Sequence, residues 1–173
     1  MLLRRHLLLL AAPGGGLARA AAPSLYALDL KFTDDRGAVR RLAEWQGRAV
    51  VLTMAYGACR SICSSTLRTL EALQADADRK GLALEILVAS IDPAEDTPQA
   101  WAQYRRARKL GRANWSFLSG SATDTRRLAQ FLGVRFWRYD EHVMHDFRIV
   151  RLAADGSIAS ALYWDQRDTA QLL

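Results

Sequence analysis

The two cysteines of the chain, Cys59 and Cys63, lie four positions apart in the segment YGACRSICSSTL (56–67). We expect a helix to begin here. The partial positive charge of its first turn, together with Arg60 between the thiols, favours the thiolate form of cysteine. Thiolates attack disulfides and bind soft metal ions such as Cu(I). Cysteines at i and i+4 of a helix also have α-carbons roughly 6 Å apart, within reach of a disulfide. The pair therefore predicts a redox-active dithiol, a soft-metal site or a structural disulfide.

A soft ion held by two sulfurs is short of a third ligand, and an imidazole would suit it. His6 lies in an N-terminal segment that we expect to be removed, which leaves His142 and His145 in YDEHVMHDF (139–147). Both precede an expected strand by a few residues. A single histidine is more often a surface or capping residue than a ligand. The residues alone therefore leave both candidates open.

The N-terminus has the pattern of a secretory signal peptide. Arg4 and Arg5 precede the uncharged stretch 7–18, and the sequence Ala-Arg-Ala at 18–20 offers a cleavage site. The uncharged stretch is too short to span a bilayer. We therefore expect residues 1–20 to be a signal peptide.

The remaining residues, 21–173, are expected to form a single domain that is exported, to the periplasm or otherwise outside the cytoplasm. Such a compartment is oxidising, which suits a disulfide or a protected metal site. The chain has 24 Lys and Arg against 18 Asp and Glu, and loss of the three leader arginines would leave 21 against 18. This small excess gives no support to nucleic-acid binding, and no such motif is present. We expect no nucleic-acid partner, no stable membrane span and a monomer.

Two continuous apolar runs, at 48–56 and 82–91, predict strands that are buried on both faces. The segment between them has leucines spaced along one helical face and ends at Gly81, a typical helix stop. A strand, a helix and a second strand in succession predict a parallel strand pair. The cysteines would lie where the first strand gives way to the helix.

The other segments complete an α/β pattern. We expect an N-terminal β-hairpin, two further helices, a short strand, a C-terminal hairpin around Asp155-Gly156 and a short final helix. The N-terminal hairpin is expected at 25–39 and the two helices at 97–111 and 121–133. The short strand is expected at 114–118, the C-terminal hairpin at 145–164 and the final helix from about residue 165. The predicted fold is thioredoxin-like, with a central mixed sheet flanked by helices.

Several other side chains that could take part in chemistry are better explained by structural roles. Met54 and Met144 carry soft sulfurs but belong to strand patterns, which favours a place in the core. Asp92 ends a strand and is expected to have a structural loop role. The pattern favours a solvated helix end for a basic cluster, with docking to an acidic partner as the alternative. The cluster consists of Arg105, Arg106, Arg108, Lys109 and Arg112.

Four ordered segments resemble the Sco/SenC family of thioredoxin-fold copper chaperones, which act in cytochrome c oxidase assembly. They are YGACRSICSSTL, SIDPAEDTP, NWSFLSG and HDFRIVRLAADG, and the resemblance covers roughly residues 25–165. It implies that Cys59, Cys63 and a later histidine bind copper. The family's histidine stands ten residues before the Asp-Gly of the final hairpin. His145 has this spacing to Asp155, whereas His142 is three residues too early.

The chain departs from the family pattern around the cysteines. Arg60 and Ser61 replace the usual Pro-Asp/Glu pair, and Ser64 replaces a second proline. A cation in place of an acid favours thiolate but opposes a nearby divalent cation. The resemblance implies bound copper, and these departures from the family pattern favour Cu(I) over Cu(II).

The resemblance implies an exported protein that delivers copper to a cytochrome c oxidase or prepares its copper site. The expected partner is the copper-bearing subunit of the oxidase or another copper chaperone. The alternative is a thiol-disulfide reductase that acts on a partner's cysteines, with Cys59 and Cys63 as the redox pair and Cys59 as nucleophile. A structural disulfide and a peroxide-reducing thioredoxin relative are the remaining alternatives. Only the copper-binding hypothesis needs His145.

Overall fold

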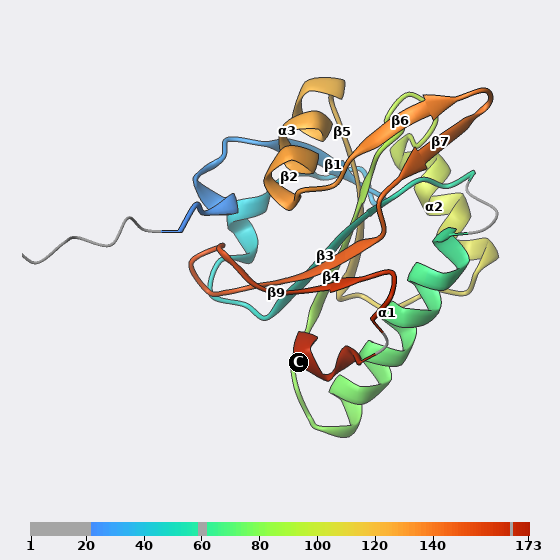
Figure 1. Ribbon diagram of the computed structural model, residues 1–173. Coiled ribbons are helices and arrows are strands. Elements are labelled where there is room, and N and C mark those ends of the chain that lie inside the picture. The colour runs from blue at the N-terminus through green and yellow to red at the C-terminus, as the bar shows by residue number, and fades with distance from the viewer. Residues whose placement is uncertain (1–21, 59–61, 167) are drawn as a thin grey trace, which may run out of the picture.

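The computed structural model describes residues 22–58, 62–166 and 168–173 (Figure 1). Its main sheet has the strand order β2-β1-β5-β4-β3-β8-β9, and β6 and β7 pair as a small second sheet. The strands are β1 Lys31–Asp34, β2 Val39–Arg41, β3 Val50–Ala55, β4 Glu85–Ser90, β5 Trp115–Gly120, β6 Phe136–Tyr139, β7 His142–His145, β8 Arg148–Leu152 and β9 Ile158–Tyr163. The helices are α1 Ile62–Arg79, α2 Pro98–Ala107 and α3 Ala122–Leu132, with 3-10 turns at Leu25–Ala27, Leu42–Trp45 and Thr169–Leu172.

The centre of the main sheet is parallel and its outer pairs are antiparallel. Strand β4 pairs in parallel with both β3 and β5, while β8 runs antiparallel to β3. Every residue of β3 is buried, which explains its continuous apolar run. On the other side, β1 pairs antiparallel with both β2 and β5. The mixed sheet and the N-terminal hairpin predicted from the sequence are both confirmed.

The ends of the helices follow their capping residues. The side chain of Thr97 accepts the backbone N–H of Ala100 at the start of α2, and Ser121 accepts that of Asp124 at the start of α3. Helix α3 ends at Gly133, whose φ of 64° is a conformation that glycine adopts without a steric penalty. The helix starts predicted at 97 and 121 and the helix end predicted at 133 are therefore confirmed.

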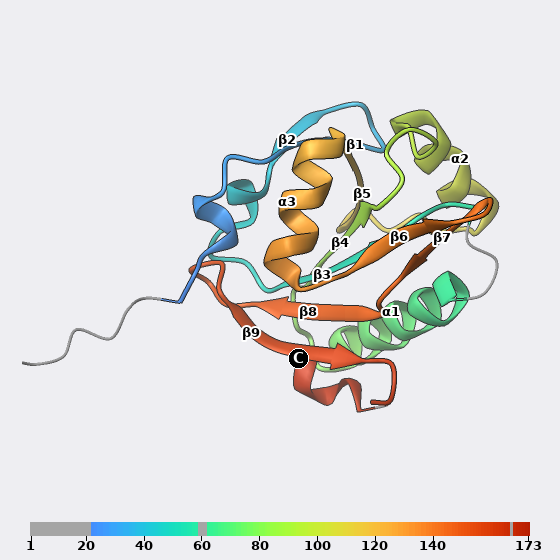
Figure 2. The same ribbon diagram turned by 45° about the horizontal axis from the view of Figure 1, so that its top comes forward.

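The helices cover the two faces of the main sheet. Helices α1 and α2 lie on one side and α3 on the other, as Figures 1 and 2 show from two directions. Large side chains fill the space between these layers, among them Trp101 from α2 and Phe117 from β5. Among the described residues, no helix combines the length and apolar character needed to cross a membrane.

Several predicted boundaries differ from the structure. Helix α2 ends at Ala107 rather than at Gly111, because the chain turns at Lys109, where φ is 57°. Strand β4 begins at Glu85, since the preceding Leu82 is exposed instead of continuing the buried run. The C-terminal hairpin turns through 153–157 rather than through two residues. The short final helix is a 3-10 turn.

The β6–β7 hairpin was missed by the sequence analysis, which expected no strand between the helix at 121–133 and the C-terminal hairpin at 145–164. In the structure His142 begins β7 and His145 ends it. The strands are four residues long and rich in polar side chains, so they lack the usual strand pattern. An ion pair between Arg135 and Asp146 holds the two ends of the hairpin together at 2.9 Å. The hairpin projects toward the end of the molecule where α1 begins (Figures 1 and 2).

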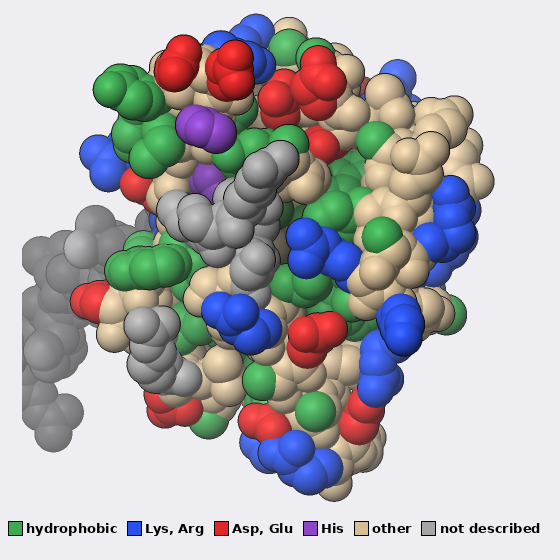
Figure 3. Space-filling view, turned by 90° about the vertical axis from the view of Figure 1, so that its right-hand side faces the viewer, with side chains coloured by type: hydrophobic (Ala, Val, Ile, Leu, Met, Phe, Trp, Pro, Cys, Tyr) green, Lys and Arg blue, Asp and Glu red, His purple; other side chains and the backbone are tan. Residues whose placement is uncertain are grey.

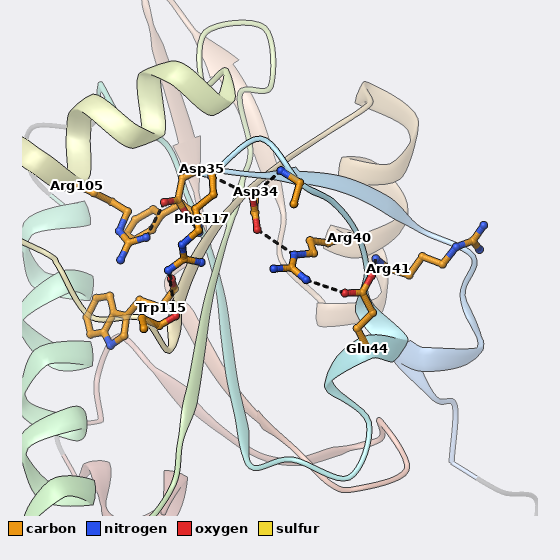
Figure 4. A network of polar contacts seen from close by, with 11 residues as sticks. Asp34, Asp35, Arg40, Arg41, Glu44, Arg105, Trp115 and Phe117 are labelled. Atoms are coloured by element: carbon orange, nitrogen blue, oxygen red, sulfur yellow. Dashed lines mark hydrogen bonds and ion pairs between the residues drawn. The ribbon is translucent and has the colours of Figure 1, made fainter.

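Arg105 does not belong to the solvated cluster predicted for it. Its guanidinium is buried and lies 2.6 Å from Asp35, which follows β1 (Figure 4). It also donates hydrogen bonds to the carbonyl oxygens of Leu110 and Arg112, at 3.0 and 2.7 Å. The other basic residues of the cluster are exposed, as expected. Arg105 therefore joins the end of α2 to the segment that follows β1.

Candidate metal centre

The candidate centre lies past the carboxyl end of β3, where open α/β sheets place their ligands. After β3 the chain passes through Tyr56, Gly57 and Ala58 toward Cys59, and α1 begins at Ile62. The predicted connection from a central strand to a helix is therefore confirmed. Cys63 belongs to the first turn of α1. Cys59 lies outside the described residues, and so does the predicted approach of the two sulfurs.

His145 lies beside the chain segment that leads to the cysteines. Its imidazole is 7% exposed and meets the ring of Tyr56 edge to face, with centroids 6.0 Å apart and an interplanar angle of 81°. Tyr56 directly follows β3, while His145 ends β7, far along the chain. On the face shown in Figure 3, histidine side chains lie among hydrophobic ones. The fold thus brings the predicted histidine next to the predicted cysteine segment.

The two ring nitrogens of His145 have different surroundings. Nδ1 lies 3.0 Å from the backbone carbonyl oxygen of Asp146. A carbonyl can only accept a hydrogen bond, so Nδ1 carries the ring proton. Nε2 then keeps its lone pair. It is buried and has no hydrogen-bond partner among the described residues. A histidine held through one nitrogen, with the other unpaired, has the arrangement typical of a metal ligand.

Asp96 is a residue of this region that the sequence analysis missed. Its carboxylate accepts the backbone N–H of Gly57 at 2.9 Å and the hydroxyl of Ser90 at 2.6 Å. Burial raises the pKa of Asp96 to about 6, against the opposing effect of these two hydrogen bonds, and the charges of Asp92 and Glu95 raise it further. Its position in SIDPAEDTP, just past β4, was the available signal.

The structure also shows where the weaker candidates for site residues lie. His142 is exposed at the start of β7, and Met54 is buried in the core as expected. The core position expected for Met144 is wrong, because alternation along β7 turns its side chain outward, where it is 39% exposed. Asp92 has the expected loop role and also lies 3.5 Å from Arg138 of β6. Among these candidates it is His145 that turns inward from the hairpin, with an Nε2 that has no partner in the described part of the chain.

A model of the SCO1/SenC family matches residues 19–172 of the chain. The chain belongs to the SCO1/SenC family. The range that matches contains Cys59, Cys63, Asp96 and His145. The resemblance inferred from four short segments is therefore confirmed over nearly the whole length.

Individual relatives of this SCO1/SenC protein are more distant. A "Putative copper-binding protein" of Stutzerimonas stutzeri is 30% identical over 123 residues, which are 65% of this chain and 57% of the relative. The chain thus spans a little over half the length of that protein.

Two solved structures share the fold of this SCO1/SenC protein. A "putative electron transfer protein" from Aquifex aeolicus VF5 is 17% identical, with a TM-score of 0.77 over 87% of this chain and 89% of that one. Yeast Sco1 with copper bound is 20% identical, with a TM-score of 0.72 over 87% of this chain and 85% of that one. These likenesses show that the predicted thioredoxin-like fold is correct.

Proposed function

We propose that this SCO1/SenC protein binds copper through Cys59, Cys63 and His145 and acts in the assembly of a cytochrome c oxidase. The observation that carries the proposal is that Nε2 of His145, beside the chain that leads to Cys59, is buried and has no hydrogen-bond partner among the described residues. A redox pair or a structural disulfide would have no need of such a nitrogen. Relatives named for copper binding lend further support.

The donor set suits Cu(I). Two thiolates and a neutral imidazole are soft ligands that can form a trigonal site. Arg60 between the cysteines favours the thiolates, and its positive charge opposes the more highly charged Cu(II). Metal affinity should fall as the pH drops, because protons compete for all three ligands.

The wider role follows from the family. The protein would deliver copper to the copper-bearing subunit of the oxidase, or prepare that subunit's site, and would act as a monomer. Another copper chaperone is the alternative partner. Residues 1–20 would be removed during export, leaving 21–173 as a single domain outside the cytoplasm. The mass of the mature protein recovered from an exporting host tests the cleavage, which should follow Ala20.

Metal analysis of the reduced protein tests the copper site. The wild type should retain copper after Cu(I) loading and desalting, and His142→Ala should do the same because His142 is exposed. His145→Ala should bind Cu(I) at least about tenfold more weakly. Equal copper retention by the two variants would contradict the proposed ligand set. A reduced wild type that binds no copper but reduces a partner's disulfide would instead indicate the thiol-disulfide reductase.

A further inference from the structure

The chain that leaves His145 also forms one wall of a separate cavity of about 470 Å³. This volume falls within the range of small-molecule sites. The cavity lies between the end of α3, the start of β8 and the segment that ends β9. Its main lining residues are Gly133, Phe147, Arg148, Tyr163, Trp164 and Asp165.

Arg148 provides a cation without a partner in this cavity. Within residues 22–58, 62–166 and 168–173, no hydrogen bond or ion pair is made by its guanidinium, and its Nε is buried. The neighbouring Arg135 differs, because its guanidinium donates two hydrogen bonds to Asp146, at 2.9 and 3.1 Å. A buried donor without an acceptor is uncommon in folded proteins and calls for an explanation.

The Arg148 guanidinium is held in place by its neighbours. Arg148 stands opposite Tyr163 in the β8–β9 pair, and its Cζ lies 5.0 Å from the centre of the tyrosine ring. On another side it lies against Gly133, where the methyl group of an alanine would clash with Nη1. A cation stacked on an aromatic ring is stabilised and oriented by it. Its remaining donors are therefore fixed in direction before any ligand arrives.

Aromatic side chains form the wall beside this cation. Phe147 and Trp164 meet edge to face, with ring centroids 5.7 Å apart and an interplanar angle of 78°. Trp164 is 52% exposed and Tyr163 is 43% exposed, which is unusual for such large apolar groups. An oriented cation next to an apolar wall suits a ligand that has an anionic head and an apolar body.

We propose that this cavity binds a carboxylate carried on a small apolar or aromatic group. The carboxylate would accept hydrogen bonds from Arg148, whose planar fork matches its two oxygens. The apolar body would lie against Phe147 and Trp164. Free aromatic acids and the carboxyl end of a polypeptide both present this chemistry.

The surrounding charges favour a monoanion. The cavity is also bordered by Asp146, which is engaged by Arg135, and by Asp165, which makes no ion pair with Arg148 in the described structure. The Arg135–Asp146 pair is neutral and the charge of Asp165 formally offsets that of Arg148, so the described lining has no net charge to balance more than one added negative charge. Asp165 would repel a phosphate dianion more strongly than a monocarboxylate.

A titration of the full chain, followed by the NMR resonance of the Trp164 indole N–H, tests the proposal. Benzoate represents a free acid and N-acetylphenylalanine a polypeptide end, and their neutral amides, benzamide and N-acetylphenylalaninamide, are the matched controls. At least one carboxylate should shift the resonance with a saturable curve, at least about tenfold more tightly than its amide. The probe that binds more tightly identifies the source of the carboxylate. Amides that bind as well as the acids, or no saturable binding by either acid, would overturn the proposal.

Variants of Arg148 complete the test. Arg148→Gln should lose about tenfold or more in affinity for the carboxylate that binds. Arg148→Lys keeps the charge but not the fork, so it should bind with intermediate affinity and serves if the glutamine variant does not fold. The control Asp165→Asn should bind at least as tightly as the wild type. Unchanged carboxylate affinity in both Arg148 variants would contradict the proposal and leave the copper site unaffected.

Discussion

The carboxylate of Asp96 accepts the backbone N–H of Gly57 at 2.9 Å, so a buried acid beyond β4 holds the chain that leads to Cys59. The same carboxylate accepts the hydroxyl of Ser90, while the carbonyl oxygen of Asp96 accepts that of Ser119. These contacts join the ends of β3, β4 and β5 at one edge of the sheet. Asp96 thereby fixes the strand end from which the cysteine segment departs.

The raised pKa of Asp96 predicts a pH-dependent stability. Its pKa is about 6 in the folded protein against 3.8 ordinarily, so the folded state binds the proton more tightly than the unfolded state. The contribution of Asp96 to stability is therefore fully present below about pH 4 and falls by roughly 3 kcal/mol as the pH rises to about 6. Asp96→Asn removes the titration and keeps an acceptor for Gly57. Urea unfolding should show a gap between this variant and the wild type that widens, in favour of the variant, between about pH 4 and 6.

Asp96→Ala removes both the titration and the hydrogen-bond acceptor for Gly57, so it should be less stable than Asp96→Asn in the same urea experiment. Alanine cannot accept the Gly57 N–H, and an unpaired buried donor costs about 1–3 kcal/mol. If the unfolding free energies of wild type and Asp96→Asn run parallel across this pH range, the raised pKa is not a property of the folded protein.

The sequence contained most of what determines the main sheet. Continuous apolar runs predicted β3 and β4, and the caps at Thr97, Ser121 and Gly133 predicted helix ends, because these signals are local. The β6–β7 hairpin has no such signal. Its inward side chains, Val143 and His145, alternate with exposed ones over only four residues. Its existence depends on packing against the rest of the fold, which a local pattern does not record.

The candidate site was only partly predictable, because some of its contacts join residues that are far apart in the sequence. Cysteine spacing and family resemblance selected the cysteines and His145, but the contact with Tyr56 is a long-range one. The errors at Arg105 and Met144 are of the same kind. Arg105 is buried because it pairs with Asp35, which is distant in the sequence. Met144 points outward because of its place in the register of β7.

Arg105 should be important for stability. Its guanidinium is 9% exposed, pairs with Asp35 at 2.6 Å and satisfies two backbone carbonyls. Arg105→Leu leaves the buried carboxylate uncompensated, so unfolding should become easier by about 3–5 kcal/mol. Urea denaturation measures the change. Arg106→Leu is the matched control, because Arg106 is exposed, and should lie within about 0.5 kcal/mol of the wild type.

The two cysteines should form a disulfide in the exported protein. Cys59 and Cys63 are spaced for one, and an oxidising compartment would close it. Free-thiol counting under denaturing conditions should give close to zero for protein purified without reductant and about two after reduction. Two reactive thiols in the untreated protein would contradict a redox-switchable copper site.

The tautomer of His145 gives a test of the copper site that does not depend on mutation. Because Nδ1 donates to the carbonyl of Asp146, the reduced, metal-free protein should show His145 protonated at Nδ1 and bare at Nε2. Long-range proton–nitrogen NMR distinguishes the two neutral tautomers, and the exposed His142 provides an internal reference. Addition of Cu(I) should move the Nε2 resonance of His145 while Nδ1 stays protonated, and should leave His142 unchanged. A His145 protonated at Nε2, or a copper-induced shift at His142 alone, would show that the metal is held elsewhere.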